Sequence, residues 1–307
     1  MKITVLTGGV GGAKFVLGLE RCGLVDELTA IVNTGDDFRQ LGLHISPDID
    51  TLLYTLSGRA NAQQGWGREG ESWQFLDALR SLHGPDWFLL GDGDLALHVL
   101  RSHRLAQYES LSTITADFAR SWNIATRVLP MSDDAVATMV DTDVGELEFQ
   151  RYFVERRCEP QVRGIRFAGA STARAASGVV EAIHTADAIF IAPSNPYLSV
   201  DPILAVADIA AALRTVRVPV VVISPLVGGK AVKGPTTKLM AELGVPATNA
   251  AIAEHYAGIA TAMLHDSSDA PPPALPSLAT STLMHTLDDK QRVAREALQL
   301  AQSIAAQ

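Results

Sequence analysis

The sequence predicts an α/β fold built on a mainly parallel sheet with helices on both faces. Short apolar runs rich in β-branched residues recur along the chain, and most are followed by a Gly-rich or polar turn. Segments of helical composition then follow these turns, which is typical of βα units whose strands are buried on both faces. The alternation indicates a Rossmann-like architecture, and 307 residues are enough for one large domain of this kind or a core with a small attached part.

The predicted elements follow the apolar pattern in order. The expected strands are Lys2–Leu6, Leu28–Asn33, Ala125–Met131, Ala186–Ala192 and Val218–Ser224, and the expected helices are Ala13–Leu19, Leu52–Leu56, Ser72–Leu82, Leu111–Trp122, Val200–Leu213 and Leu287–Ile304. Val136–Asp141 and Glu146–Phe153 alternate strongly around a short turn, which predicts a β-hairpin. We therefore expect a Rossmann-like core over residues 1–265, with helices and a hairpin inserted at about 95–165. Residues 266–307 would be a Pro-rich linker and a C-terminal helix.

The bulk properties exclude several classes of protein. A formal net charge of −9 argues against general nucleic-acid binding, which needs a basic surface. No apolar run approaches the length of a membrane span, and the chain begins with a strand rather than a signal peptide. Two cysteines provide neither a disulfide framework nor a metal-binding pair. These observations predict a cytoplasmic protein with no nucleic-acid or membrane partner.

The first nineteen residues place a Gly-rich turn between a buried strand and a helix. Glycines allow close approach to an anion, and a helix N-terminus offers unpaired N–H groups, so this turn predicts a phosphate site. Its candidate residues are Gly9, Gly11, Gly12 and Lys14. The turn lacks the hydroxyl of a P-loop, and Lys14 stands where a dinucleotide fingerprint has its third glycine. A tight turn without a ligand is the alternative.

Four aspartates follow within fifteen residues, at the end of the second predicted strand and before the next helix. They are Asp36, Asp37, Asp48 and Asp50. Mg²⁺ prefers one or two carboxylates together with waters and phosphates, so this cluster beside a phosphate loop predicts metal or substrate binding. The alternative is that the aspartates only form turns and cap helices.

Two further segments carry candidate binding residues. Trp66 lies between glycines in a polar loop, where it either covers the core or offers a flat surface to a ring system. The sequence Gly91-Asp92-Gly93-Asp94 follows an apolar run, and His98 comes one helical turn after Asp94, so both side chains can face one pocket. A hydrogen-bonded core histidine is the alternative for His98.

The later strands also end in loops suited to anions. Ser194 and Asn195 follow one strand, and either bind a nucleotide or simply form a turn. The strand at 218–224 runs into a segment with two lysines and three glycines. Its candidate nucleotide-binding residues are Gly228, Gly229, Lys230 and Lys233.

Taken together, the ordered motifs resemble the CofD family, the 2-phospho-L-lactate transferases of coenzyme F-420 biosynthesis. The matching motifs are TGGVGGAKF (7–15), NTGDD (33–37), SPDIDTLLYTLSG (46–58), GWG (65–67), LGDGDLALH (90–98), SNP (194–196) and SPLVGGKAVKGP (224–235). The resemblance implies a guanylyl-diphospho-acid donor along the Gly-rich loops, the deazaflavin Fo as acceptor near Asp48 and Asp50, and Mg²⁺ between them. It also implies a homodimer. Gly93 departs from the family, which often carries a basic residue at this position.

The implied reaction is attack of the ribityl hydroxyl of Fo on the phosphorus that bears the acid, with release of GMP. Such a reaction depends on positioning and charge neutralisation. We expect Asp50, or Asp48, to orient the hydroxyl, and Asp36, Asp37 and Asp48 to hold Mg²⁺. Acceptor contacts are expected from Asp50, Trp66, Asp92, Asp94 and His98. The transferred acid is phospholactate, phosphoenolpyruvate or phosphoglycerate. A regulatory nucleotide binder of the YvcK type and a nicotinamide oxidoreductase are the competing hypotheses.

Overall fold

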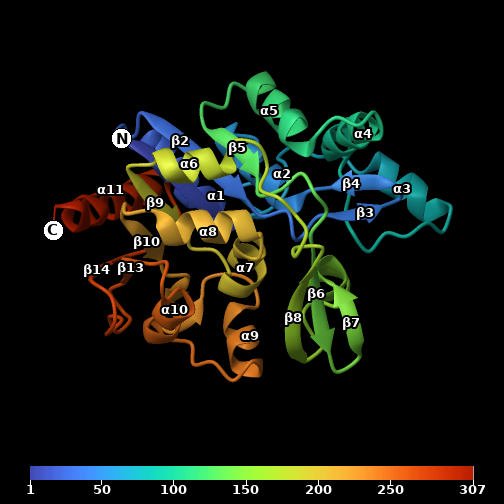
Figure 1. Cartoon of the computed structure of the whole chain (residues 1–307). Coiled ribbons are helices and arrows are strands. Elements are labelled where there is room, and N and C mark those ends of the chain that lie inside the picture. Colours follow the sequence, from blue (N-terminus) through green and yellow to red (C-terminus); the bar gives the residue numbers. More distant parts are fainter. Residues whose placement is uncertain (307) are drawn as a thin grey trace.

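Seven parallel strands form the central sheet of the protein, seen here in a computed structural model that describes residues 1–306 (Figure 1). The strand order is β14-β13-β10-β9-β1-β2-β5, and every neighbouring pair runs parallel. The strands are β1 (Lys2–Thr7), β2 (Glu27–Val32), β5 (Arg127–Pro130), β9 (Ala188–Ile191), β10 (Val220–Ile223), β13 (Ala262–Asp266) and β14 (Ser277–Thr280). The predicted α/β, Rossmann-like class is confirmed.

Helices cover both faces of the sheet because the strands bury side chains on both sides. Ile3 and Val5 of β1 belong to a core shared with α1, α2, α5 and α11, whereas Leu6 belongs to a second core shared with α6 to α10. The helices are α1 (Gly9–Arg21), α2 (Pro47–Leu56), α3 (Gln74–Ser81), α4 (Asp92–Ala106), α5 (Leu111–Ser121), α6 (Val179–Thr185), α7 (Asp201–Leu204), α8 (Ala207–Thr215), α9 (Thr236–Glu242), α10 (Asn249–His255) and α11 (Leu287–Ala305).

None of the individual helices within residues 1–306 has the length and hydropathy needed to cross a membrane. The pair Pro196–Leu204 and Ala207–Thr215, bent by 87°, meets that criterion only when its two parts are taken together, by length and composition. Its first part is a π-helical turn, η2 (Pro196–Val200), followed by α7. The single helix predicted at Val200–Leu213 is therefore broken between α7 and α8.

The segment expected as an insertion, 95–165, contains an edge strand of the main sheet. β5 pairs with β2, and the long connection between these two strands contains α4 and α5 after the β3–β4 hairpin, α2 and α3. The predicted hairpin is present in a separate antiparallel sheet ordered β7-β6-β8, which extends away from the main sheet in Figure 1. These strands are β6 (Ala137–Thr142), β7 (Gly145–Glu148) and β8 (Val162–Ala168), with a π-helical turn, η1 (Arg151–Glu155), between the last two.

The C-terminal segment also takes part in the core. Ser277–Thr280, within the stretch expected to be a linker, pairs with β13 as strand β14. The helix α11 packs so closely on α1 that a Cβ at Gly18 would lie 2.2 Å from the Lys290 carbonyl oxygen. Residues 266–306 thus complete the sheet and cover one of its faces.

The carboxyl ends of β1, β2, β9 and β10 lie at one edge of the sheet, as parallel pairing requires. Two small hairpins flank this edge: β3 (Phe38–Gln40) with β4 (Leu43–Ile45), and β11 (Leu226–Val227) with β12 (Lys230–Ala231). The Gly-rich turn, the Asp36–Asp37 turn, the Ser194–Asn195 turn and the lysine-bearing loop therefore all start from this edge.

Candidate active site

The Gly-rich turn between β1 and α1 is packed against the loop after β9. A Cβ at Gly11 would lie 2.6 Å from the Pro193 carbonyl oxygen, and one at Gly12 would lie 2.2 Å from Thr7 Oγ1. Ser194 Oγ donates to the Gly8 carbonyl at 2.7 Å. Glycines are needed here because the two loops approach each other more closely than any side chain would allow. Ser194, a predicted nucleotide-binding residue, thus also fixes the turn.

Asp48 lies directly over this turn. Its Oδ1 accepts a hydrogen bond from the Gly9 N–H at 2.8 Å, and its Oδ2 accepts one from Asn33 Nδ2 at 3.0 Å. Burial raises the pKa of Asp48 to about 6, although both hydrogen bonds favour the ionised form. The predicted phosphate turn therefore already holds one carboxylate, and that carboxylate can change its protonation state near neutral pH.

Asp36 and Asp37 form the turn after β2, and each has an unpaired oxygen. The Oδ1 atoms of both residues are buried and have no hydrogen-bond partner. Asp37 Oδ2 accepts from Ser46 Oγ at 2.7 Å and lies 3.0 Å from His44 Nε2. Burial raises the pKa of both carboxyls, and the neighbouring charge of Asp48 raises that of Asp36 further. Burial in this half of the acidic cluster therefore disfavours the ionised carboxylates, and a bound cation would favour them.

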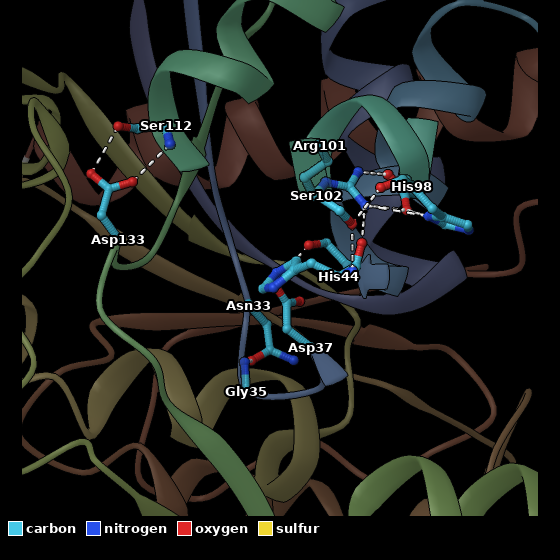
Figure 2. A network of polar contacts seen from close by, with 11 residues as sticks. Asn33, Gly35, Asp37, His44, His98, Arg101, Ser102, Ser112 and Asp133 are labelled. Atoms are coloured by element: carbon cyan, nitrogen blue, oxygen red, sulfur yellow. Dashed lines mark hydrogen bonds and ion pairs between the residues drawn. The ribbon is translucent and has the colours of Figure 1, made fainter. Parts of the chain in front are cut away.

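Asp50, in contrast, is neutralised by a buried arginine. Arg101 Nη1 donates to Asp50 Oδ2 at 3.2 Å, and Nη2 donates to Asp50 Oδ1. Arg101 is fully buried on α4, and Figure 2 shows its guanidinium between His98 and His44 of strand β4. The carboxylate of Asp50 is thus held in a buried ion pair. The geometry favours a positioning role for Asp50 over the predicted direct catalytic one.

Asp94 and His98 extend this paired half of the cluster. His98 Nε2 lies 3.0 Å from Asp94 Oδ2, and His98 Nδ1 lies 3.6 Å from Asp50 Oδ2. The Tyr54 hydroxyl donates to Asp94 Oδ1. His98 is buried, so it contacts the other site residues rather than the solvent. Asp94 and His98 thus lie against each other, as their spacing on the helix predicts, and Asp94 is the more exposed of the two.

Within residues 1–306, one group of three side chains brings its ligand atoms together as a metal site would. Asp50, Asp94 and His98 bring one ligand atom each within 4.8 Å of the others. Arg101 already places a positive charge on Asp50, which disfavours a second cation there. Asp36 and Asp37 have unpaired buried oxygens, the hard donors that Mg²⁺ prefers, and the charge of Asp48 acts on Asp36. Asp36, Asp37 and Asp48 do not bring their ligand atoms within 4.8 Å of one another in this structure, so an ion bound there would draw them together or take further ligands from water and substrate.

The remaining acceptor-site candidates are placed by the loop between α2 and α4. Asp92 accepts from Ser72 Oγ and from the N–H groups of Gln74 and Phe75, at 2.6 to 3.1 Å, so it caps α3. Trp66 is 48% exposed, which excludes it from covering the core and leaves its ring available to a ligand. The space above Gly93 is filled by the guanidinium of Arg68.

In the loops after β9 and β10, several of the predicted anion-binding groups already bond other parts of the protein. The Gly228 and Gly229 N–H groups donate to Asp269 at 3.0 and 2.6 Å, and Lys233 Nζ donates to the Gly65 carbonyl at 3.3 Å. Lys230 is exposed. Asn195 uses its Oδ1 to cap η2, while its buried Nδ2 has no partner and can donate to a ligand.

Lys14 lies on the first turns of α1 and is half-buried. Burial lowers its pKa, and the nearby charges of Lys290 and Lys233 lower it further. The proximity of these like charges indicates that the region attracts anions, as the sequence predicts for Lys14 and Lys233.

Sequence reasoning missed three side chains that shape the site: Asn33, Arg101 and Arg68. Asn33 donates a hydrogen bond to Asp48. Its position directly after β2 and before the Asp36–Asp37 turn could have indicated that it belongs to the site. Arg101 had a signal in its spacing, because it follows Asp94 and His98 along one face of α4. No sequence pattern indicated Arg68, because its contacts with Glu71 and Gly93 depend on the path of the loop that carries it.

Comparison with known proteins agrees with this geometry. A sequence model of the family described as 2-phospho-L-lactate transferase CofD matches residues 3–303. The chain belongs to the CofD family. The predicted resemblance is confirmed, and with it the prediction that the protein is a transferase enzyme.

The relatives and solved structures cover almost the whole chain. Phosphoenolpyruvate transferases of Streptomyces griseus and Nocardia farcinica are 41% and 38% identical to it, covering 100% and 98% of this chain and 100% and 95% of their own. A crystal structure of a UPF0052 family protein from Bacillus halodurans superposes with a TM-score of 0.64, covering 97% of this chain and 100% of its own. That protein is 17% identical, so it supports the fold alone.

Proposed function

We propose that this CofD-family protein transfers a phosphoenolpyruvyl group from a guanylyl-diphospho donor to the ribityl hydroxyl of the deazaflavin Fo in coenzyme F-420 biosynthesis. The observation that carries the proposal is Asp48, which accepts hydrogen bonds from the Gly9 N–H of the Gly-rich turn and from Asn33, together with the unpaired buried oxygens of Asp36 and Asp37 in the turn after β2. Phosphoenolpyruvate is preferred over phospholactate and phosphoglycerate because full-length relatives at about 40% identity are phosphoenolpyruvate transferases.

In this proposal the hydroxyl oxygen of Fo forms a bond to the phosphorus that bears the acid. The bond from that phosphorus to the bridging oxygen breaks, and GMP leaves with the electron pair. Asp48 accepts the hydroxyl proton, since a pKa of about 6 leaves its carboxylate largely ionised at neutral pH yet able to take a proton. The predicted role of Asp50 becomes that of a positioning residue, because its carboxylate is ion-paired with the buried guanidinium of Arg101, whereas Asp48 has only uncharged donors.

Asp36 and Asp37 would hold Mg²⁺, with Asp48 adjacent. The bound ion would neutralise charge on the diphosphate. The chain's own contribution is to bind and orient the donor: Lys14, Lys233 and the free Nδ2 of Asn195 supply positive charge and a hydrogen-bond donor to the guanylyl diphosphate. Trp66 offers its exposed face to the deazaflavin ring.

A donor panel tests the proposal. The three guanylyl-diphospho acids are incubated separately with saturating Fo and Mg²⁺, and GMP and the phosphodiester product are followed by mass spectrometry. We expect turnover to be highest with the phosphoenolpyruvyl donor and to disappear in Asp36→Asn. Tight nucleotide binding without turnover on any donor would instead support a regulatory binder, the function that competes most directly. A homodimer in the cytoplasm is proposed with this activity and is tested separately, by light scattering and cell fractionation.

A further inference from the structure

Glu71 and Arg68 fill the space around the two glycines that start α4. The Gly93 N–H donates to Glu71 Oε2 at 2.7 Å, and Arg68 Nη1 donates to Glu71 Oε1 at 3.2 Å. A Cβ at Gly91 would lie 2.4 Å from the Glu71 carboxylate, and a Cβ at Gly93 would lie 2.2 Å from Arg68 Nη1. The arginine of the loop therefore occupies the volume that a side chain at position 93 would take.

Neither glycine is required by its backbone conformation. Gly91 has φ of −74°, Gly93 lies in the first turn of α4, and neither has a positive φ. The glycines therefore serve to admit Glu71 and Arg68. Gly91 leaves room for the Glu71 carboxylate, and Gly93 leaves room for the Arg68 guanidinium. This pair of glycines indicates that a defined position of the guanidinium is needed here.

Arg68 is bonded to Glu71, but most of its N–H donors have no partner among the described residues. Its partner Glu71 is only 7% exposed, whereas the Arg68 side chain is 32% exposed. Within residues 1–306, the hydrogen bond to Glu71 is the one hydrogen bond that the guanidinium makes to the protein, so its remaining N–H donors are free for a ligand. A planar fork anchored at one end is well suited to bind an oxyanion at the other.

The surroundings explain why a cation is useful at this place. Arg68 lies over Gly93, and the next residue along α4, Asp94, belongs to the cluster with His98 and Asp50. An anionic substrate group would be repelled by these carboxylates. The nearby Arg101 does not help, since it is fully buried and both its terminal nitrogens bond Asp50.

We propose that Arg68 is a substrate-binding residue that holds an oxyanion of the donor at the start of α4. This inference rests on the proposed function. The oxyanion is either the carboxylate of the transferred acid or its phosphate, and both groups suit a guanidinium. Glu71 and Gly93 serve to place the arginine.

The test compares Arg68→Gln with three matched variants. Donor KM, Fo KM and kcat are measured for each, together with the Kd of the intact donor and of GDP by calorimetry. We expect Arg68→Gln to raise donor KM and Kd by about tenfold or more, the loss typical of one hydrogen bond to a charged group, with kcat and Fo KM changed less. An unchanged GDP Kd assigns the contact to the carboxylate, and a weakened one assigns it to the phosphate. Either result supports the inference.

The matched variants separate binding from folding. Glu71→Gln keeps the guanidinium and should bind the donor within a few-fold of the wild type, and Arg68→Lys should lose less than Arg68→Gln. Moving the charge, in Arg68→Gly with Gly93→Arg, should recover donor affinity. An unchanged donor Kd in folded Arg68→Gln would overturn the inference, and so would a loss in Arg68→Lys as large as that in Arg68→Gln together with no recovery in the double variant. Absence of wild-type turnover on all three donors would overturn the proposed function, while the donor Kd would still test Arg68.

Discussion

Both oxygens of Asp50 are bonded by the guanidinium of Arg101, at a point where neither residue is reached by solvent. The pair joins α2 to α4, two helices separated by 35 residues of chain between Leu56 and Asp92. It also divides the acidic cluster: within residues 1–306, Asp50 and Asp94 are paired with Arg101 or His98, while Asp36 and Asp48 form no salt bridge.

Removing Arg101 is expected to destabilise the fold strongly. Arg101→Met leaves Asp50 buried and unpaired, which costs about 3–5 kcal/mol in the free energy of unfolding. Urea denaturation measures the loss, and adding Asp50→Asn to the same chain should recover part of it. Arg120→Met is the matched control, since its salt bridge with Asp117 lies at the surface and should be worth less than about 1 kcal/mol. Equal losses in the two arginine variants would contradict the assignment of Arg101 to a buried ion pair.

We expect the ionised Asp36 carboxylate to lower the free energy of unfolding of the metal-free protein. Burial raises its pKa above the ordinary value, so its ionisation favours unfolding, and the free energy of unfolding falls as the pH rises above about 4. Asp36→Asn removes this penalty and should be more stable than the wild type by about 1–3 kcal/mol at pH 8 in a chelator, with a smaller difference at pH 4. Turnover of the same variant should fall by about 100-fold or more. A variant that is less stable at pH 8 would show that the carboxylate has a partner within the fold.

The loops at the edge of the sheet were predictable because parallel strands bring their carboxyl ends together. Asp36 and Ser194, which are 158 positions apart, were both placed at this edge from the strand pattern alone. The pairing of Asp50 with Arg101 was not predictable, since it depends on how α4 lies against α2. Strand β14 was missed for another reason: an edge strand buries less surface, so Ser277–Thr280 has no long apolar run.

The protonation of Asp48 should set the low-pH limit of turnover. Because the pKa is about 6 in the metal-free site, the carboxylate is increasingly protonated below pH 6. The protonated form can neither accept the proton of the substrate hydroxyl nor contribute a negative charge beside Mg²⁺. We expect kcat/KM to fall about tenfold for each pH unit below that value, and the midpoint to move to lower pH as Mg²⁺ is raised, because the metal competes with protons. A pH profile at three Mg²⁺ concentrations measures this shift. A midpoint independent of Mg²⁺ would place Asp48 away from the metal.

Asp92 and Asp94 are expected to differ in their effects although they are two positions apart. Asp92 caps α3 through the N–H groups of Gln74 and Phe75, so Asp92→Ala should speed amide hydrogen exchange at those residues while changing Fo KM little. Asp94 bonds Tyr54 and lies against His98 in the site, so Asp94→Asn should raise Fo KM or lower kcat by about tenfold or more without faster exchange in α3. Hydrogen exchange followed by mass spectrometry, with steady-state kinetics on the same samples, separates the two. A larger kinetic loss in Asp92→Ala than in Asp94→Asn would return Asp92 to the acceptor site that the sequence predicts for it.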